Sequence, residues 1–346
     1  MSNLIFSIVV PIFNVARTIH TTISYLKELD FEDYEVILIN DGSTDETKEV
    51  VQKLITNKKN FKLFNATNGG PGAARNLGIK KSVGEYILFF DSDDFPAKSI
   101  LKKYKKILDN DPKIDLIISS FSFTTKVNNQ IVSTKEYLVP KKYYQDRNKF
   151  LNDIYSLMNR QLMYVVWNKC YRRDLIVENE VTFPNYRSCE DRIFNLKYYK
   201  CCEHVWLDTE IEYFYQYDGG QGITTQYFPD KFKSFKEFYD LANMVTENNA
   251  KAGFAALYLK GIVSTVMSIL NTSKLSKKQK IKEINLILSD ESVMEAKEIA
   301  LTDTKIKIMT KAIFNAHSII FIKCVKMINL IEINSPKLMS HFKRTY

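Results

Sequence analysis

Strand and helix signals alternate through the first hundred residues, and this alternation constrains the fold of the 346-residue chain more than any other feature. Buried strands are expected at residues 4–10, 34–40, 61–65 and 84–90. Helices are expected between them at residues 16–29, 44–55 and 72–82, the second with Thr44 as its N-cap. Apolar strands interleaved with helices predict an α/β fold, a mostly parallel sheet flanked by helices on both faces. In such sheets a ligand binds beyond the carboxyl ends of the strands.

The rest of the chain is less regular and then becomes helical. Strands at 114–121 and 131–137 and a helix at 147–158 precede a stretch that is typical of helix throughout from about residue 230. Because a chain of this length usually forms more than one core, we expect three regions, residues 1–110, 111–225 and 226–346.

The C-terminal region carries nearly all of the net charge of +9. Residues 226–346 contain 19 Lys and Arg against 11 Asp and Glu, whereas residues 1–225 contain 30 against 29. A basic helical region is most often a solvated face that packs on its neighbours. The alternatives are peripheral contact with an anionic membrane, the holding of a phosphate-rich acceptor, or formation of a homo-oligomer. We expect no nucleic-acid partner.

Cysteine usage and the apolar runs indicate a cytoplasmic protein. Five cysteines form no CxxC pair and leave one over under any pairing, which favours a reducing compartment. The N-terminus has no cationic leader, and its apolar run stops at Pro11, so we expect a strand there and no signal peptide. No uninterrupted apolar stretch reaches the 18 or so residues that cross a bilayer. Location at the inner face of the membrane stays open.

Three aspartates follow the strand at 84–90 within four positions, in the sequence ILFFDSDDF. Asp91 and Asp93 are two residues apart at a strand end, so both side chains can project to the same face. Two convergent carboxylates suit Mg²⁺ or Mn²⁺, which are commonly held by one or two carboxylates together with phosphates and water. For Asp94 the alternative is a cap on the next helix, which begins near Pro96.

Two further polar segments follow strands. NDGSTDET, residues 40–47, begins like a calcium loop but has Glu at 46 and Gln at 52, where that loop needs Gly and Glu. Asp41 can instead accept the N–H of a nucleobase, while a simple turn explains Ser43 and Thr44. NGGPGAARNLG, residues 68–78, is a glycine-rich turn that opens a helix and carries Arg75, which favours phosphate binding. It matches neither GxGxxG nor the P-loop.

Together these motifs resemble glycosyltransferase family 2, which has the Rossmann-like GT-A fold. The resemblance covers residues 4–110, through SIVVPIFN, VILINDGSTDET, NGGPGAARNLGI and GEYILFFDSDD. It implies a nucleotide-sugar donor, usually a UDP-sugar, with Asp93 first and Asp91 second as ligands of Mn²⁺ or Mg²⁺. The residues that it places at the donor are Pro11, Phe13, Asn14, Asp41, Asn68, Gly70, Arg75, Asn76, Asp91, Ser92 and Asp93.

The resemblance extends to two segments of the second half, VWNKCYRRDLI and RSCEDRIFN. It implies that Asp191 is the general base and that Trp167, Lys169, Glu190 and Arg192 line the acceptor side. The alternatives are a core position for Trp167, a solvated lysine at 169, and acidic residues that only charge the first turn of a helix. One departure is that Gln216 and Tyr217 stand where relatives place an Arg or His.

The sequence therefore predicts an inverting, metal-dependent hexosyl- or N-acetylhexosaminyltransferase that acts on a bacterial cell-surface glycan such as capsule, exopolysaccharide or teichoic acid. On this reading residues 1–110 bind the donor, 111–225 bind the glycan or polyol-phosphate acceptor, and 226–346 form a helical extension. The alternative is a catalytically silent subunit that binds nucleotide-sugar. A haloacid-dehalogenase-like phosphatase is excluded, because its aspartates follow the first strand and position 95 is Phe.

Overall fold

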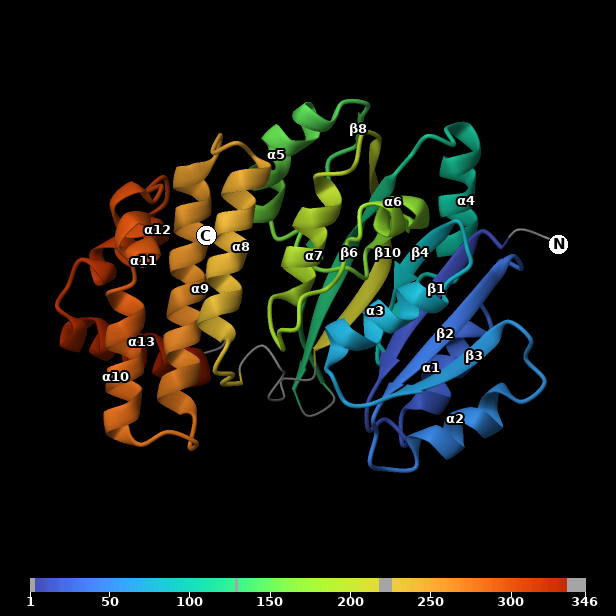
Figure 1. Cartoon of the computed structure of the whole chain (residues 1–346), viewed down its shortest axis with the longest axis horizontal. Coiled ribbons are helices and arrows are strands. Elements are labelled where there is room, and N and C mark those ends of the chain that lie inside the picture. Colours follow the sequence, from blue (N-terminus) through green and yellow to red (C-terminus); the bar gives the residue numbers. More distant parts are fainter. Residues whose placement is uncertain (1–3, 128–129, 218–225, 335–346) are drawn as a thin grey trace. The chain divides into compact units, whose positions relative to one another are not determined.

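The computed structural model describes residues 4–127, 130–217 and 226–334, and it divides the chain into two compact units, residues 1–220 and 221–346. The first unit is α/β and the second is helical (Figure 1). The strands are β1 (Phe6–Ile12), β2 (Tyr34–Asp41), β3 (Phe61–Ala66), β4 (Tyr86–Phe89), β5 (Phe95–Pro96), β6 (Leu116–Val127), β7 (Gln130–Tyr137), β8 (Lys142–Tyr144), β9 (Lys169–Arg172) and β10 (Val205–Tyr217). The helices of this unit are α1 (Ile19–Leu26), α2 (Thr47–Ile55), α3 (Pro71–Lys81), α4 (Ile100–Asn110), α5 (Arg147–Asn159), α6 (Arg173–Glu178) and α7 (Glu190–Tyr199).

The strands form one sheet in the order β3-β2-β1-β4-β9-β6-β10-β5. It is mostly parallel, as predicted: β1 pairs in parallel with β2 and β4, β2 with β3, and β6 with β10. Antiparallel pairing comes from the short strand β9, which joins β4 to β6, and from β5, β7 and β8. Every residue of β2 and β4 is buried, which explains why their sequences are continuous apolar runs and do not alternate.

Helices cover both faces of the first four strands. Because parallel crossovers are right-handed, the path from β1 to β3 places α1 and α2 on one face, and the return from β3 to β4 places α3 on the other (Figure 1). Helix α3 packs on β1 and β2. As a result, the loops that follow β1, β2, β3 and β4 meet at one edge of the sheet.

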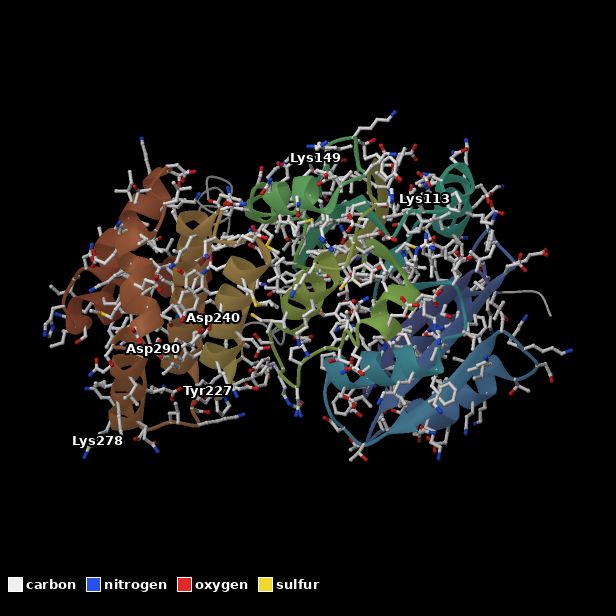
Figure 2. All side chains as sticks on the ribbon, turned by 45° about the horizontal axis from the view of Figure 1, so that its top comes forward. Lys113, Lys149, Tyr227, Asp240, Lys278 and Asp290 are labelled. Carbon is white, nitrogen blue, oxygen red and sulfur yellow. The ribbon has the colours of Figure 1, made fainter. Side chains whose placement is uncertain are left out.

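The second unit is built around α9 (Lys251–Asn271), which contacts the five other helices of this unit. These are α8 (Lys231–Val245), α10 (Lys277–Leu288), α11 (Glu291–Ile299), α12 (Lys305–Phe314) and α13 (Ser318–Asn334). In the described part of the chain, α9 is the one helix whose length and composition would allow it to cross a membrane, and 72% of that stretch is buried, as expected of a core helix. Polar links add to this packing: Lys236 of α8 donates to both carboxylate oxygens of Asp290 at 2.9 and 3.0 Å. Asp290, labelled in Figure 2, directly precedes α11.

Three local predictions were wrong. Thr44 does not cap α2, since its N–H and hydroxyl donate to the Asn14 side chain, and Asp45 accepts the N–H of Thr47, the first residue of the helix, at 3.0 Å. Asp94 does not cap α4, which begins at Ile100 after a two-residue strand. The apolar and basic run near the C-terminus is two helices, α12 and α13, because the chain turns at residues 315–317.

A candidate active site at the carboxyl edge of the sheet

The loops after β1 and β2 are joined by hydrogen bonds. The side chain of Asn14 accepts the Thr44 N–H at 2.8 Å, and the Asn14 N–H donates to the Ser43 hydroxyl at 3.0 Å. Asn14 has φ of 52°, a left-handed conformation that asparagine tolerates better than most residues. Next to it Phe13 is 45% exposed, so an aromatic face stands open at the edge, whereas Pro11 lies within β1.

Asp41 holds the glycine-rich turn in place. Its two carboxylate oxygens accept the N–H groups of Gly69 and Gly70, each at 2.8 Å. Gly70 directly precedes α3 and has φ of 87°, a backbone conformation that residues with a side chain rarely adopt. Each carboxylate oxygen has a second lone pair, so Asp41 keeps acceptor capacity beyond the turn. Asn68, in the same turn, accepts a hydrogen bond from Arg187 at 3.2 Å.

The three aspartates after β4 lie in different surroundings. Asp91 is partly exposed and pairs with Arg75 at 3.0 Å. Asp94 is buried against the hydroxyl of Tyr213, at 3.1 Å. Burial, followed by the charges of Asp91 and Asp93, raises the pKa of Asp94 to about 9. The carbonyl of Ser92 accepts a hydrogen bond from Thr22 of α1, which fixes the turn between the aspartates.

The acidic edge fits a divalent cation of the Mg²⁺ or Mn²⁺ kind. Burial is the main cause of the raised pKa of Asp94, and the negative charges of Asp91 and Asp93, which a cation would offset, add to it. Among the described residues no group of three or more His, Cys, Asp and Glu is arranged to hold a metal ion. Mg²⁺ is commonly held by one or two protein carboxylates, with phosphate and water oxygens completing the shell.

Arg75 is the centre of an ion cluster that unites both halves of the α/β unit. One terminal nitrogen of its buried guanidinium bonds Asp91 at 3.0 Å, and the other bonds Asp191 at 2.9 Å and Glu190 at 3.3 Å. The charges of these three carboxylates raise the pKa of Arg75 above its usual value, although burial alone would lower it. Residues predicted separately for the donor and acceptor sides thus lie within one hydrogen-bond shell.

The carboxylates of Glu190 and Asp191 are in the first turn of α7, where the N-terminal end of the helix dipole favours negative charge. Burial raises the pKa of Asp191 to about 7, while Arg75 opposes the rise and Glu190 and Asp91 add to it. Burial also raises the pKa of Glu190, against the effect of Arg75. A carboxyl group with a pKa near 7 is suited to proton transfer at neutral pH.

The segment before β9 is buried. Trp167 is 4% exposed and stacks on Tyr213 and Tyr215, with ring centroids 4.4 and 5.5 Å away. Lys169 is fully buried, and its ammonium donates to the carbonyl of Val165 and the side chain of Asn168 at 2.5 and 2.7 Å. Burial lowers the pKa of Lys169 to about 7, although the nearby Asp191 opposes this.

Other predicted residues make structural contacts. The guanidinium of Arg192 lies over the ring of Tyr164 at 4.3 Å. Asn76 clasps the backbone of Phe183, donating to its carbonyl and accepting its N–H, both at 2.9 Å. Sequence reasoning missed Asn195 of α7, whose buried amide donates to the carbonyls of Met163, Tyr164 and Val165. An asparagine inside an otherwise apolar helix face was the only signal for it.

Sequence reasoning also missed a cation near Gln216. Lys126 of β6 donates to the Gln216 side chain at 2.6 Å. The neighbouring Tyr215 lies close enough to the aspartates that, after burial, the charges of Asp91, Asp94 and Asp93 raise its pKa. Lys126 therefore provides a positive charge on the strand beside the position where the sequence lacks one. The pairing of β6 with β10, which produces this contact, could not be predicted from local sequence.

Comparison with known proteins gives concordant similarities. A family model described as "Glycosyl transferase family 2" matches residues 7–176. The poly(ribitol-phosphate) beta-N-acetylglucosaminyltransferase TarS of Staphylococcus aureus (strain Mu50) is 27% identical over 289 residues, 80% of this chain and 47% of TarS. The poly(ribitol-phosphate) beta-glucosyltransferase of Bacillus spizizenii is 27% identical over 231 residues, 64% of this chain and 34% of that protein. The chain thus spans less than half the length of these two relatives.

A solved structure shares the fold. The crystal structure of S. aureus TarS residues 1–349 in complex with UDP-GlcNAc matches with a TM-score of 0.63 at 22% identity, covering 92% of this chain and 90% of that one. The α/β unit with its helical C-terminal region has the GT-A architecture of this structure.

Proposed function

Because the chain belongs to glycosyltransferase family 2, we propose that it transfers a sugar from a nucleotide-sugar to a hydroxyl group of a bacterial cell-surface glycan. The names of the two relatives and the UDP-GlcNAc complex of TarS support a UDP-sugar donor, a hexosyl or N-acetylhexosaminyl group, and a polyol-phosphate acceptor of the teichoic-acid kind. The observation that carries the proposal is the ion cluster itself, in which Asp91, from the acidic strand end, and Asp191 share Arg75.

The donor is proposed to lie along the loops after β1, β2 and β4. The exposed ring of Phe13 beside Pro11 offers a face for the base, and Asp41 offers its remaining acceptor capacity to a base N–H. The turn of Asn14, Asn68 and Gly70 would support the nucleotide from the same edge. Asp91 and the backbone at Ser92 would face the ribose.

Asp93, with Asp91 as second ligand, would hold Mn²⁺ or Mg²⁺. When bound, such an ion stabilises the negative charge of the leaving diphosphate. Lys126, on the strand beside Gln216, is proposed to add a positive charge at the same edge. It would take the part of the Arg or His that is absent at residues 216 and 217.

Asp191 is proposed as the general base of an inverting transfer. The acceptor hydroxyl oxygen forms a bond to the anomeric carbon, the bond from that carbon to the diphosphate oxygen breaks, and the hydroxyl proton moves to the Asp191 carboxylate. Glu190 and Arg192 flank the base on α7 and would contact the acceptor. Because Trp167 and Lys169 are buried, we propose that they shape the acceptor side by fixing residues 162–168.

The region from residue 226 is proposed to serve the acceptor or its surroundings. Its 19 basic and 11 acidic residues give it a net positive charge, which is complementary to a polyol-phosphate chain or an anionic lipid surface. A cytoplasmic protein that visits the inner face of the membrane would use both. Homo-oligomer formation through these helices is an alternative use.

The decisive experiment is a screen of UDP-sugars with Mn²⁺ and with poly(ribitol phosphate) as acceptor. Transfer is measured as the release of UDP and as the amount of labelled sugar on the polymer. We expect transfer with at least one donor, and we expect Asp191→Asn to reduce it by about 100- to 10,000-fold, the usual contribution of a general base, while UDP still binds. Transfer at the parental rate by Asp191→Asn would disprove the base assignment. UDP binding by calorimetry without turnover on any acceptor would instead favour the catalytically silent subunit.

A further inference from the structure

The base and the acidic strand end are far apart in sequence, and two separate links from α3 bring them together. The first link is ionic: Arg75 bonds Asp91 at 3.0 Å and Asp191 at 2.9 Å, through different terminal nitrogens of one guanidinium. Arg75 and Asp191 are 116 positions apart in the chain. The side chain of Arg75 therefore connects Asp91 directly to Asp191.

The second link is apolar and starts at the next residue of the same helix. Asn76 holds the backbone of Phe183 by two hydrogen bonds of 2.9 Å. The ring of Phe183 stacks on Phe194 of α7, with centroids 3.9 Å apart and planes 4° apart. The Arg75 guanidinium lies 5.5 Å from the centroid of the same Phe183 ring. This second link positions helix α7 as a whole, whereas the ionic link determines the rotamer of the Asp191 side chain.

The chemistry of the cluster requires the forked side chain of arginine. A guanidinium is planar and presents donors in two directions, whereas the lysine ammonium is a single point charge on a flexible stem. The side chain of Arg75 is 5% exposed and that of Asp191 is 22% exposed, so water cannot fully replace either side chain as the hydrogen-bond partner of the other. One arginine faces three carboxylates, which leaves an excess of negative charge and makes the orientation of each carboxylate depend on the shared cation.

We propose that Arg75 is a positioning residue for the transfer reaction, which fixes the carboxylate of Asp191 relative to Asp91 so that the base and the donor edge form one rigid unit. In this role Arg75 orients the base without itself contacting the reacting atoms. The inference rests on the proposed function, since it presupposes that Asp191 takes the acceptor proton. It goes beyond that function because it gives Arg75 the role of orienting the general base, whereas the sequence motif alone places Arg75 near the nucleotide.

The test separates transfer from donor binding. We expect Arg75→Lys to lower kcat for transfer by about 100-fold, the loss that a base misplaced by about 1 Å produces, while Kd for UDP with Mn²⁺ stays within a factor of about three. Equal losses of kcat and of UDP affinity would show that Arg75 acts as a ligand of the donor, and would overturn the proposal. Parental kcat would overturn it as well.

A charge-balanced variant keeps the test valid if loss of the cation disturbs folding. Arg75→Gln combined with Glu190→Gln removes one positive and one negative charge together, so the net charge of the cluster is unchanged. We expect this variant to unfold in urea near the parental midpoint but to transfer at least about tenfold more slowly than Glu190→Gln alone, because the fork is missing. Transfer equal to that of Glu190→Gln alone would mean that Arg75 contributes nothing to transfer, against the proposal.

The matched control is Arg172→Lys. Arg172 of β9 is a partly buried arginine of the same unit, paired with Asp115 at 3.2 Å and hydrogen-bonded to the Ile114 carbonyl at 2.8 Å, and neither partner belongs to the cluster. Arg172→Lys should lower the free energy of unfolding, because the guanidinium is lost, and should leave kcat at the parental value. The proposed function and this inference fail in different ways. If the parental protein transfers no sugar, the proposed function fails. If the parent is active, Asp191→Asn is inactive and Arg75→Lys is fully active, this inference alone is refuted.

Discussion

Two of the three neighbouring aspartates, Asp91 and Asp94, have different electrostatic surroundings. Asp91 shares the guanidinium of Arg75, and Asp94 is buried against Tyr213 with its pKa raised to about 9. Asp93 remains the first choice for a metal ligand on the family resemblance, and this stays a prediction. The repulsion implied by the sequence DSDD is thus relieved by a side-chain cation for one residue and by burial in the protonated form for another.

The pH dependence of transfer follows from the pKa of Asp191. It is faced by Arg75 of α3, Lys169 of β9, Asp91 after β4 and Glu190 of its own helix, and its pKa is about 7 because burial outweighs the cations. The base must be ionised, so kcat/KM should rise with pH through about 7 and fall below it. Glu190→Gln removes a negative neighbour and should move this midpoint to lower pH.

A pH series of kcat/KM on the parent and on Glu190→Gln checks this prediction. Glu178→Gln, an exposed residue of α6, is the control and should leave the midpoint in place. A midpoint near 4 in the parent would contradict a raised pKa of Asp191.

At the scale of elements, α3 determines the site because it lies unusually close to the sheet. A Cβ atom on Gly78 would come within 2.2 Å of a methyl group of Val9 in β1. This close approach allows Arg75, one turn earlier in α3, to reach the edge of the sheet. The absence of a side chain at position 78 is therefore a condition for the placement of the ion cluster.

We expect Gly78→Ala to destabilise the protein by about 1–3 kcal/mol, because the overpacking at Val9 outweighs the better helix propensity of alanine. Urea unfolding of the variant measures the difference. Lys80→Ala, at an exposed position of the same helix, should change the free energy of unfolding by less than about 0.5 kcal/mol. A Gly78→Ala variant as stable as the parent would show that α3 can move away from the sheet without cost.

At the scale of the whole molecule, the last two described helices combine exposed apolar and basic side chains. Ile308, Ile319, Ile320 and Met327 are each more than 50% exposed. Residues 304–331 contain five lysines and no Asp or Glu. Exposed isoleucines beside the exposed lysines Lys305, Lys323 and Lys326 match the surface of an anionic bilayer, where each basic residue near the surface adds about 1 kcal/mol of attraction.

The full chain is therefore expected to float with vesicles that contain anionic lipid, and to bind neutral vesicles far more weakly. The triple variant Lys305→Glu, Lys323→Glu and Lys326→Glu should lose this binding, and added salt should weaken it in the parent. The matched control carries Lys277→Glu, Lys278→Glu and Lys282→Glu on α10 (Figure 2 labels Lys278). Equal flotation of both triple variants, or no flotation of the parent, would rule out this membrane contact.

The sequence by itself determined the elements and the edge at which the site lies. Apolar runs and helical periodicity are local properties, so β1 to β4, α3 and the residues after each strand could be predicted within a few positions. The donor-side set from Asn14 to Asp93 follows from the rule that parallel strands end at one edge.

Only the tertiary structure decided which charges meet. The bonds of Arg75 to Asp191, of Lys126 to Gln216 and of Asn195 to the carbonyls of residues 163–165 join segments from 30 to 116 positions apart. Local sequence carries no record of such distances, because they depend on how α3, α7 and β10 pack on the sheet. Burial is decided in the same way, and it sets the pKa of Asp191 and hence the chemistry that this carboxylate can perform.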